Sequence, residues 1–385
     1  MINELKNVPE WRFAGFVDEW EKKRLGEVTI YKNGGSFENS VKNHGIFKLI
    51  TLKSVNTEGE LINSGKYIDD KSTETLCKGT LVMVLSEQAP GLVGMTANIT
   101  RNNKYVLNQR VAALVPKQGI DSQFLSKLIN RNQKYFSVRS AGTKVKNISK
   151  GHVENFNFLS PNYTEQQKIG SFFSKLDQQI ELEEKKLAKL EEQKKGYMQQ
   201  IFSQELRFRD EDGNYYPEWE SKKLKDIANV YQPQNLSQNN FQKKGYPVYG
   251  ANGVIGYYKD FNHSNMEIAV ACRGNTCGRV NLTEPKSWIT SNAMVVNIID
   301  KMEIEFYFLY QYLRIINYSN VISGSGQPQI TRKNMNSVEL LVPNYIEQQK
   351  IGNLFRRFDD FIEKQSQKIE LLKERKQGFL QKMFV

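Results

Sequence analysis

Two stretches of the chain repeat their hydrophobic positions in alternating steps of four and three residues. Such a seam is typical of coiled-coil helices, and strong helix formers fill the positions between. The first seam is Leu176, Ile180, Glu183, Leu187, Leu190 and Lys194, and it continues to Tyr197 and Ile201. The second seam is Phe358, Ile362, Gln365, Ile369, Leu372, Lys376, Phe379 and Met383. A helix over 165–202 is about 57 Å long at about 1.5 Å per residue, which favours an extended spacer. The alternative is a pair of ordinary amphipathic core helices.

The chain is an internal duplication. Residues 161–173 return as residues 343–355, and the same shift of 182 carries Gly196 onto Gly378 without a gap. Self-similarity at a fixed shift indicates repeated structural units. A weaker similarity relates the segments that begin at Trp20 and Trp219. Each half therefore consists of an entry motif, a variable body and a closing helix.

The polar seam positions predict how the two helices are oriented. A parallel, in-register pair would place Lys194 against Lys376, a contact between like charges. An antiparallel pair whose residue numbers sum to 559 places Glu183 against Lys376 and Lys194 against Gln365. That arrangement removes the repulsion and adds one attractive pair. We therefore expect antiparallel helices in this register.

The two bodies show strand patterns interrupted by Gly, Asn and Pro, followed in each case by a helical pattern. In the first body the β-type runs include 80–86 and 95–100, with a helix near 122–132. In the second body the runs include 246–258, 267–272 and 293–299, with a helix near 304–316. The matching order predicts one α+β fold used twice.

These patterns predict an α+β protein with two similar domains, separated by two long helices that form an antiparallel coiled coil with pseudo-twofold internal symmetry. The expected boundaries are 1–163 for the first domain, 164–203 for the first spacer helix, 204–345 for the second domain and 346–385 for the second spacer helix.

The charge of the chain indicates a polyanionic partner. The 385 residues include 54 Lys and Arg against 42 Asp and Glu, a formal net charge of +12. Residues 165–202 are balanced and residues 346–385 carry a small basic excess, so most of the positive charge belongs to the two bodies. This distribution favours nucleic acid over the alternative, a soluble basic protein without such a partner.

Three cysteines, Cys77, Cys272 and Cys277, argue against a disulfide framework and for a reducing compartment. The first residues lack the apolar segment of a signal peptide, and no run approaches the length of a membrane span. We therefore expect a cytoplasmic protein.

The sequence contains no recognisable catalytic motif. It has three histidines without a His-x-x-x-His pair, and no nucleophile elbow, Walker loop, Rossmann fingerprint or Asn/Asp-Pro-Pro-aromatic motif of amino-methylating enzymes. His263, Cys272 and Cys277 are the nearest approach to a metal site. Because a fourth ligand and a Cys-x-x-Cys pair are missing, we expect no metal there.

The closing motifs, the seams, the Trp-Glu entries and the loop at residues 324–330 together resemble the specificity subunit of type I restriction-modification systems. The resemblance spans nearly the whole chain, and it is loose over the bodies. It implies two target-recognition domains, each recognising one half of a bipartite double-stranded DNA site, with the helices as a spacer between them.

The resemblance also implies partners and cofactors. The spacer would dock two methyltransferase (modification) subunits that bind S-adenosylmethionine. Restriction and translocase subunits that use ATP and Mg would join that core, while this chain would bind no cofactor and have no catalytic residue of its own. The first body departs from the family pattern at Gly142, where the Gly-Gln-Pro form seen at 326–328 is missing.

The loops that precede the two closing helices correspond under the shift of 182, 140–150 with 322–332. Arg, Lys, Gln and Asn tips on such loops reach phosphates and base edges, although ordinary polar loops remain an alternative. The candidate DNA contacts are Gln88, Arg110, Lys144, Lys146 and Asn147 in the first body, and Asn252, Arg273, Arg279, Gln327, Gln329 and Arg332 in the second.

We therefore expect a DNA-recognition subunit that is not an enzyme by itself. Two alternatives stay open at this point: an enzyme whose site has no familiar motif, and a coiled-coil scaffold that binds proteins without DNA specificity.

Overall fold

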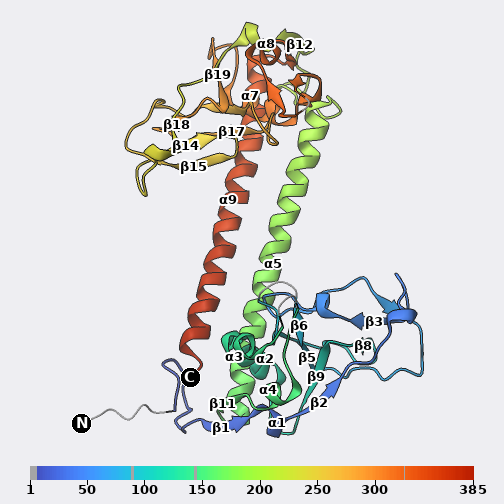
Figure 1. The fold of residues 1–385 in the computed structure, drawn as a ribbon. Coiled ribbons are helices and arrows are strands. Elements are labelled where there is room, and N and C mark those ends of the chain that lie inside the picture. The colour runs from blue at the N-terminus through green and yellow to red at the C-terminus, as the bar shows by residue number, and fades with distance from the viewer. Residues whose placement is uncertain (1–6, 88–90, 143–144, 325) are drawn as a thin grey trace. The chain divides into compact units, whose positions relative to one another are not determined.

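The computed structural model describes residues 7–87, 91–142, 145–324 and 326–385 (Figure 1). It divides into two compact units, the first made of residues 1–184 with 367–385 and the second of residues 185–366. Two long helices, α5 (Tyr163–Phe202) and α9 (Tyr345–Lys382), each contribute one part to each unit. Each helix begins and ends within three residues of the segment expected for it.

The body of the first unit alternates short strands with short helices. Its strands are β1 (Glu21–Arg24), β2 (Thr29–Asn33), β3 (Phe47–Ile50), β4 (Tyr67–Ile68), β5 (Leu81–Val84), β6 (Ser86–Glu87), β7 (Thr96–Asn98), β8 (Tyr105–Leu107), β9 (Val111–Pro116), β10 (Lys146–Asn147) and β11 (Asn157–Ser160). Its helices are α1 (Leu25–Val28), α2 (Ser122–Arg131), α3 (Gln133–Arg139) and α4 (Lys150–Glu154).

The body of the second unit follows a similar order, without an α-helix at the place of α3. Its strands are β12 (Glu220–Lys223), β13 (Ala228–Tyr231), β14 (Tyr246–Gly250), β15 (Gly253–Tyr258), β16 (Ile268–Ala271), β17 (Val280–Leu282), β18 (Trp288–Ile289), β19 (Ala293–Ile298), β20 (Ile322–Ser323), β21 (Gln329–Ile330) and β22 (Glu339–Val342). Its helices are α6 (Leu224–Ile227), α7 (Phe306–Ile315) and α8 (Arg332–Asn336).

The two bodies have the same sheet topology. Each contains an antiparallel four-stranded sheet, ordered β2-β9-β5-β7 in the first unit and β13-β19-β16-β17 in the second. Each also contains a three-stranded sheet that combines one antiparallel and one parallel pairing, ordered β4-β3-β8 and β15-β14-β18. The prediction of one α+β fold used twice is confirmed.

Corresponding aromatic side chains build the two cores. In the first unit Trp20, Phe124, Phe173 and Phe384 are buried together, and the rings of Phe124 and Phe384 stack with centroids 5.4 Å apart. In the second unit Trp219, Phe308, Phe355 and Phe202 are the equivalents, and Phe202 stacks on Phe355 at 5.9 Å. Each core therefore needs an aromatic residue from the end of a long helix or directly after it.

Within each unit the two long helices pack antiparallel, as the seam predicts. In the first unit Phe172 of α5 contacts Phe379 of α9, and further along α5 Glu184 pairs with Lys373. In the second unit Tyr197 contacts Phe358, and Phe202, further along α5, contacts Phe355. Residue numbers rise along one helix as they fall along the other, which defines the antiparallel orientation.

The expected register is wrong. Lys376 pairs with Asp177 rather than Glu183, and Glu183 accepts a hydrogen bond from Lys368. Lys194 pairs with Asp359 rather than Gln365. These partners lie six to eight residues from the expected ones. A lysine side chain reaches a flanking carboxylate as readily as one in the seam, so the seam alone does not define the polar pairs.

Most seam positions are shielded from solvent. Ile180, Glu183, Lys194, Ile369 and Leu372 are buried, and Leu176, Leu187, Leu190, Ile362 and Lys376 are half-buried, whereas Tyr197 is 40% exposed. Leu182, Phe361 and Leu371, which lie off the seam, are more than half exposed. This contrast is what a heptad pattern predicts.

The repeated closing motif is explained by how each long helix begins. Glu165 is fully buried and receives two hydrogen bonds from Arg12, and Glu347 is held in the same way by Arg207. A Cβ added at Gly170 would collide with the Asp121 carboxylate that caps α2. The motif therefore attaches each long helix to its own body.

Candidate nucleic-acid interface

The first body gathers polar residues around Leu85, where β5 leads into β6. The amide of Leu85 donates to the carbonyl of Arg110 at 3.0 Å, and the amide of Ile148 donates to the carbonyl of Leu85 at 3.0 Å. Ser86 pairs with Asn147 in the β6–β10 ladder, and their side chains are hydrogen-bonded. We call Ser86, Arg110 and Asn147 the first polar cluster.

The second body repeats this framework around Cys272. The amide of Cys272 donates to the carbonyl of Asn292 at 3.0 Å, and the amide of Ile330 donates to the carbonyl of Cys272 at 3.0 Å. Arg273 forms a β-bridge with Gln329. Arg273, Asn292 and Gln329 form the second polar cluster, so one backbone arrangement presents two different sets of side chains.

The structure brings most of the predicted contact residues of the second body to this place. Arg279 lies beside it, because the Ala271 amide donates to the Arg279 carbonyl at 2.8 Å. Asn252 occupies the turn between β14 and β15, and Thr276 donates a hydrogen bond to the neighbouring carbonyl of Ala251. The remaining candidates of this body, Gln327 and Arg332, lie in the β20–β21 hairpin and at the start of α8, and both are exposed.

Fewer of the predicted contact residues can be placed in the first body. Lys146 and Asn147 are exposed on β10, and Arg110 is exposed beside them. The predicted contacts Gln88 and Lys144 lie outside the described residues. Gly142 and Gly324 are nevertheless equivalent, since a Cβ added at either glycine would collide with the carbonyl oxygen three residues later.

Sequence reasoning did not include Asn292 among the contact residues. Asn292 is exposed and directly precedes β19, as Arg110 directly precedes β9. The shift of 182 relates these two positions, so the repeat itself carried the signal. The signal is weak because the strands of the two bodies share few residues at equivalent positions.

His263 and Cys272, two of the three residues considered as metal ligands, make other contacts. His263 is buried, its Nε2 lies 3.0 Å from the Tyr231 hydroxyl, and burial lowers its pKa. The Cys272 thiol lies against the carbonyl of Ser291, and burial raises its pKa. Over the described ranges of the chain, no group of three or more His, Cys, Asp or Glu side chains is arranged to hold a metal ion.

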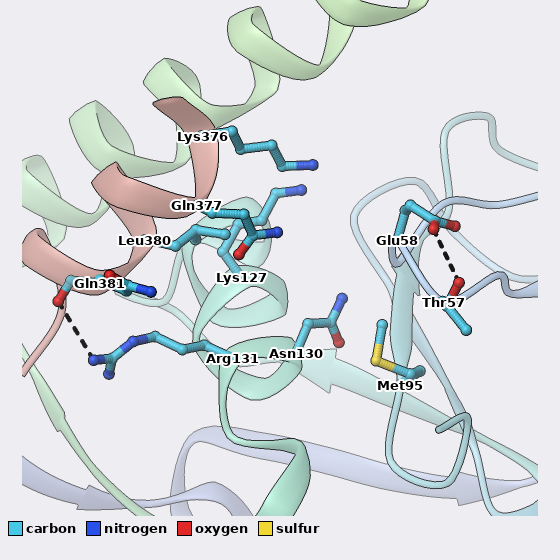
Figure 2. Close-up of a pocket in the computed structure, with 10 residues that line it drawn as sticks. All are labelled: Thr57, Glu58, Met95, Lys127, Asn130, Arg131, Lys376, Gln377, Leu380 and Gln381. Atoms are coloured by element: carbon cyan, nitrogen blue, oxygen red, sulfur yellow. Dashed lines mark hydrogen bonds between the residues drawn. The ribbon is translucent and has the colours of Figure 1, made fainter. Parts of the chain in front are cut away.

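A charged cavity of about 420 Å³ lies in the first unit between α2 and the last turns of α9 (Figure 2). Figure 2 shows the amine ends of Lys127 and Lys376 pointing the same way. Asp177 pairs with both, at 2.5 Å from Lys127 and 2.7 Å from Lys376. The two cations share one carboxylate, so this cluster ties α2, α5 and α9 together rather than offering free charge to a ligand.

Similarity to known proteins identifies the family of this chain. The model of the type I restriction modification DNA specificity domain matches residues 17–192 and 216–374. The chain belongs to this family. The two matches correspond to the two halves of the duplication, so the resemblance predicted from sequence is confirmed.

Individual specificity subunits are more distant relatives. The type I restriction enzyme EcoprrI specificity subunit of Escherichia coli is 27% identical over 147 residues, which span 37% of this chain and 36% of that protein. The MjaIX specificity subunit of Methanocaldococcus jannaschii is 23% identical over 406 residues, which span 95% of this chain and 92% of that protein. The alignment with the E. coli subunit thus covers about a third of its length.

A solved structure has the same fold. The type I restriction-modification S subunit from M. genitalium superposes with a TM-score of 0.72 at 16% sequence identity, covering 98% of this chain and 99% of that one. The likeness extends over both bodies and both long helices. Within the described part of this specificity subunit, none of the helices combines the length and the apolar character that a membrane span requires.

Proposed function

We propose that this specificity subunit recognises a bipartite double-stranded DNA site, with one polar cluster directed at each half. The observation that carries the proposal is the repeated backbone framework around Leu85 and Cys272, which presents Arg110 and Asn147 in one body and Arg273 and Gln329 in the other. A duplicated scaffold with different exposed side chains is suited to two different base sequences.

The long helices act in this proposal as the spacer between half-sites. Major-groove contacts on one face of B-DNA recur about every 34 Å, one turn of the duplex. A helix of 40 residues, such as α5, extends over about 60 Å at about 1.5 Å per residue, enough to separate two such contacts. The net charge of +12 supplies attraction to phosphate that weakens as salt rises.

The chain works in this proposal as part of a larger enzyme in the cytoplasm. It docks two methyltransferase subunits through the long helices and neighbouring surfaces, and restriction and translocase subunits join them. S-adenosylmethionine, ATP and Mg bind to those partners, and this chain itself catalyses no reaction. Support comes from the family, whose members carry the name of a specificity subunit.

The experiment uses the tagged full chain, purified from its host with the subunits that accompany it. Selection from a pool of random duplexes should enrich a site with two short defined parts separated by a gap. Methylation of host DNA at that site should disappear when the gene is deleted and return with it. A complex that shows no sequence preference would contradict the proposal and favour a protein-binding scaffold.

A further inference from the structure

Arg110 and Asn292 occupy the same place in the two bodies. Arg110 directly precedes β9, whose first residue pairs with the last residue of β5, and Asn292 directly precedes β19, which pairs with β16 in the same way. The carbonyls of both residues accept the amide that follows the central strand, Leu85 in one body and Cys272 in the other. The two residues therefore occupy equivalent positions in the strand pairing, although the backbone has a positive φ at Arg110 and not at Asn292.

Both side chains are exposed, and their chemistry differs. Arg110 has a φ of 65°, a left-handed backbone conformation that a residue with a long side chain rarely adopts. Glycine or asparagine would fit this conformation with less strain, and such outliers are concentrated at functional positions. An arginine thus occupies a position where local backbone conformation alone favours another residue.

From this equivalence we infer that Asn292 contacts a base in the second half-site, at the position where Arg110 contacts a base in the first. The inference rests on the proposed function and extends it to a residue outside the predicted contact set. It assigns the difference between the half-sites in part to one pair of equivalent positions, an arginine in one body and an asparagine in the other.

The neighbouring positions fit this division. Asn147 and Gln329 are equivalent and carry the same amide group. Ser86 is 2% exposed and bonds Asn147, whereas its equivalent Arg273 is exposed. The guanidinium of the first cluster therefore comes from Arg110, and that of the second cluster comes from Arg273.

The hydrogen-bonding groups of the bases predict which base each side chain prefers. Arginine forms two hydrogen bonds with O6 and N7 of guanine, and asparagine forms two with N6 and N7 of adenine. We assign adenine to the base that Asn292 contacts and guanine to the base that Arg110 contacts. An exchange of these side chains should exchange these preferences at one base pair of each half-site.

The test compares the wild-type complex with Asn292→Arg and Arg110→Asn, each purified as the full chain with its accompanying subunits and selected against random duplexes. Asn292→Arg should shift one base pair of the second half-site from adenine towards guanine by about tenfold to a hundredfold. Arg110→Asn should produce the opposite shift in the first half-site. The untouched half-site should stay the same in each variant.

Asn297→Arg is the matched control, because Asn297 is an exposed asparagine at the other end of β19 and gains the same charge. Asn297→Arg should leave both half-sites unchanged. If Asn292→Arg and Asn297→Arg raise affinity for all duplexes alike without a change of preferred base, Asn292 is not a base contact and the inference is overturned.

Asn292→Ala provides a second readout that adds no bulk or charge. It should lose preference at the same base pair while the melting temperature stays near the wild-type value, and an unaltered preference would also overturn the inference. These results differ from a failure of the proposed function, in which the wild-type complex itself selects no bipartite site.

Discussion

The Asp177 carboxylate links three helices of the first unit. It pairs with Lys127 of α2 and Lys376 of α9, and the Lys127 side chain is only 10% exposed. Asp359 is its equivalent in the second unit, where it pairs with Lys194 and accepts a hydrogen bond from Gln311. In the second unit Gln311 stands where the first unit has Lys127. The cluster around Asp359 therefore has one lysine for one carboxylate, whereas the cluster around Asp177 has two.

Asp177→Asn should destabilise the first unit. The substitution removes the carboxylate that pairs with two neighbouring ammonium groups. Loss of one partner from a buried pair costs about 3–5 kcal/mol. Since Asp177 is 24% exposed, we expect a loss of about 2–4 kcal/mol in the free energy of unfolding, measured by urea denaturation. Asp360→Asn, at an exposed position of α9, is the control and should change stability by less than about 0.5 kcal/mol.

Arg273→Ala should reduce discrimination more than affinity. A guanidinium that contacts a base contributes about 1–3 kcal/mol of preference for the correct base, whereas a phosphate contact contributes to all sequences equally. Competition between the selected site and a scrambled duplex measures the two effects separately. Equal losses for both duplexes would instead assign Arg273 to the DNA backbone.

At the scale of elements, the sequence predicted the long helices well because a seam is a local periodic signal. Leu176 and Ile180 identify the buried face without knowledge of the partner. The register was not predictable in the same way, since Lys376 finds Asp177, a flanking residue that no seam pattern singles out. The polar clusters were only partly predicted, because Arg110 and Asn292 come next to Leu85 and Cys272 through strand pairing between distant segments.

Lengthening both helices should lengthen the gap between half-sites. We would insert seven residues after Glu184 and seven after Ser366, at the division between the two units, because a whole heptad keeps the seam in phase. The insertion adds about 10 Å, or roughly three base pairs. Duplex selection should return the same two half-sites with a wider gap.

An insertion in α5 alone is the control for this experiment. It displaces the seam of one helix against the other and should lower the melting temperature without defining a new gap. If the doubly extended protein is folded and still prefers the original gap, the helices do not set the spacing.

At the scale of the whole molecule, the duplication separates specificity from architecture. The closing motif, the aromatic core and the paired helices are nearly the same in both halves, while the polar clusters differ. Exposed loop residues on a common scaffold are free to vary without loss of the fold. Substitutions in one body should therefore change the half-site that this body recognises and leave the other half-site unchanged.

Exchange of residues 205–342 for the corresponding body of another family member tests this independence. The exchanged segment contains β12 and β22, which pair with each other, so no strand pairing of this sheet is divided. Methylation mapping of host DNA should show one new half-site and one unchanged half-site at the original gap. Changes in both half-sites would show that the bodies do not act separately.

The burial of Phe384 in the first core has a consequence for biosynthesis. The ribosome makes the segment 367–385 only after all of the second unit, yet Phe384 stacks on Phe124 and is 3% exposed. During translation the first unit therefore waits with part of its apolar interior uncovered until the late segment arrives. The half that is synthesised first is completed last, and apolar surface exposed during such a delay makes a folding intermediate prone to aggregation.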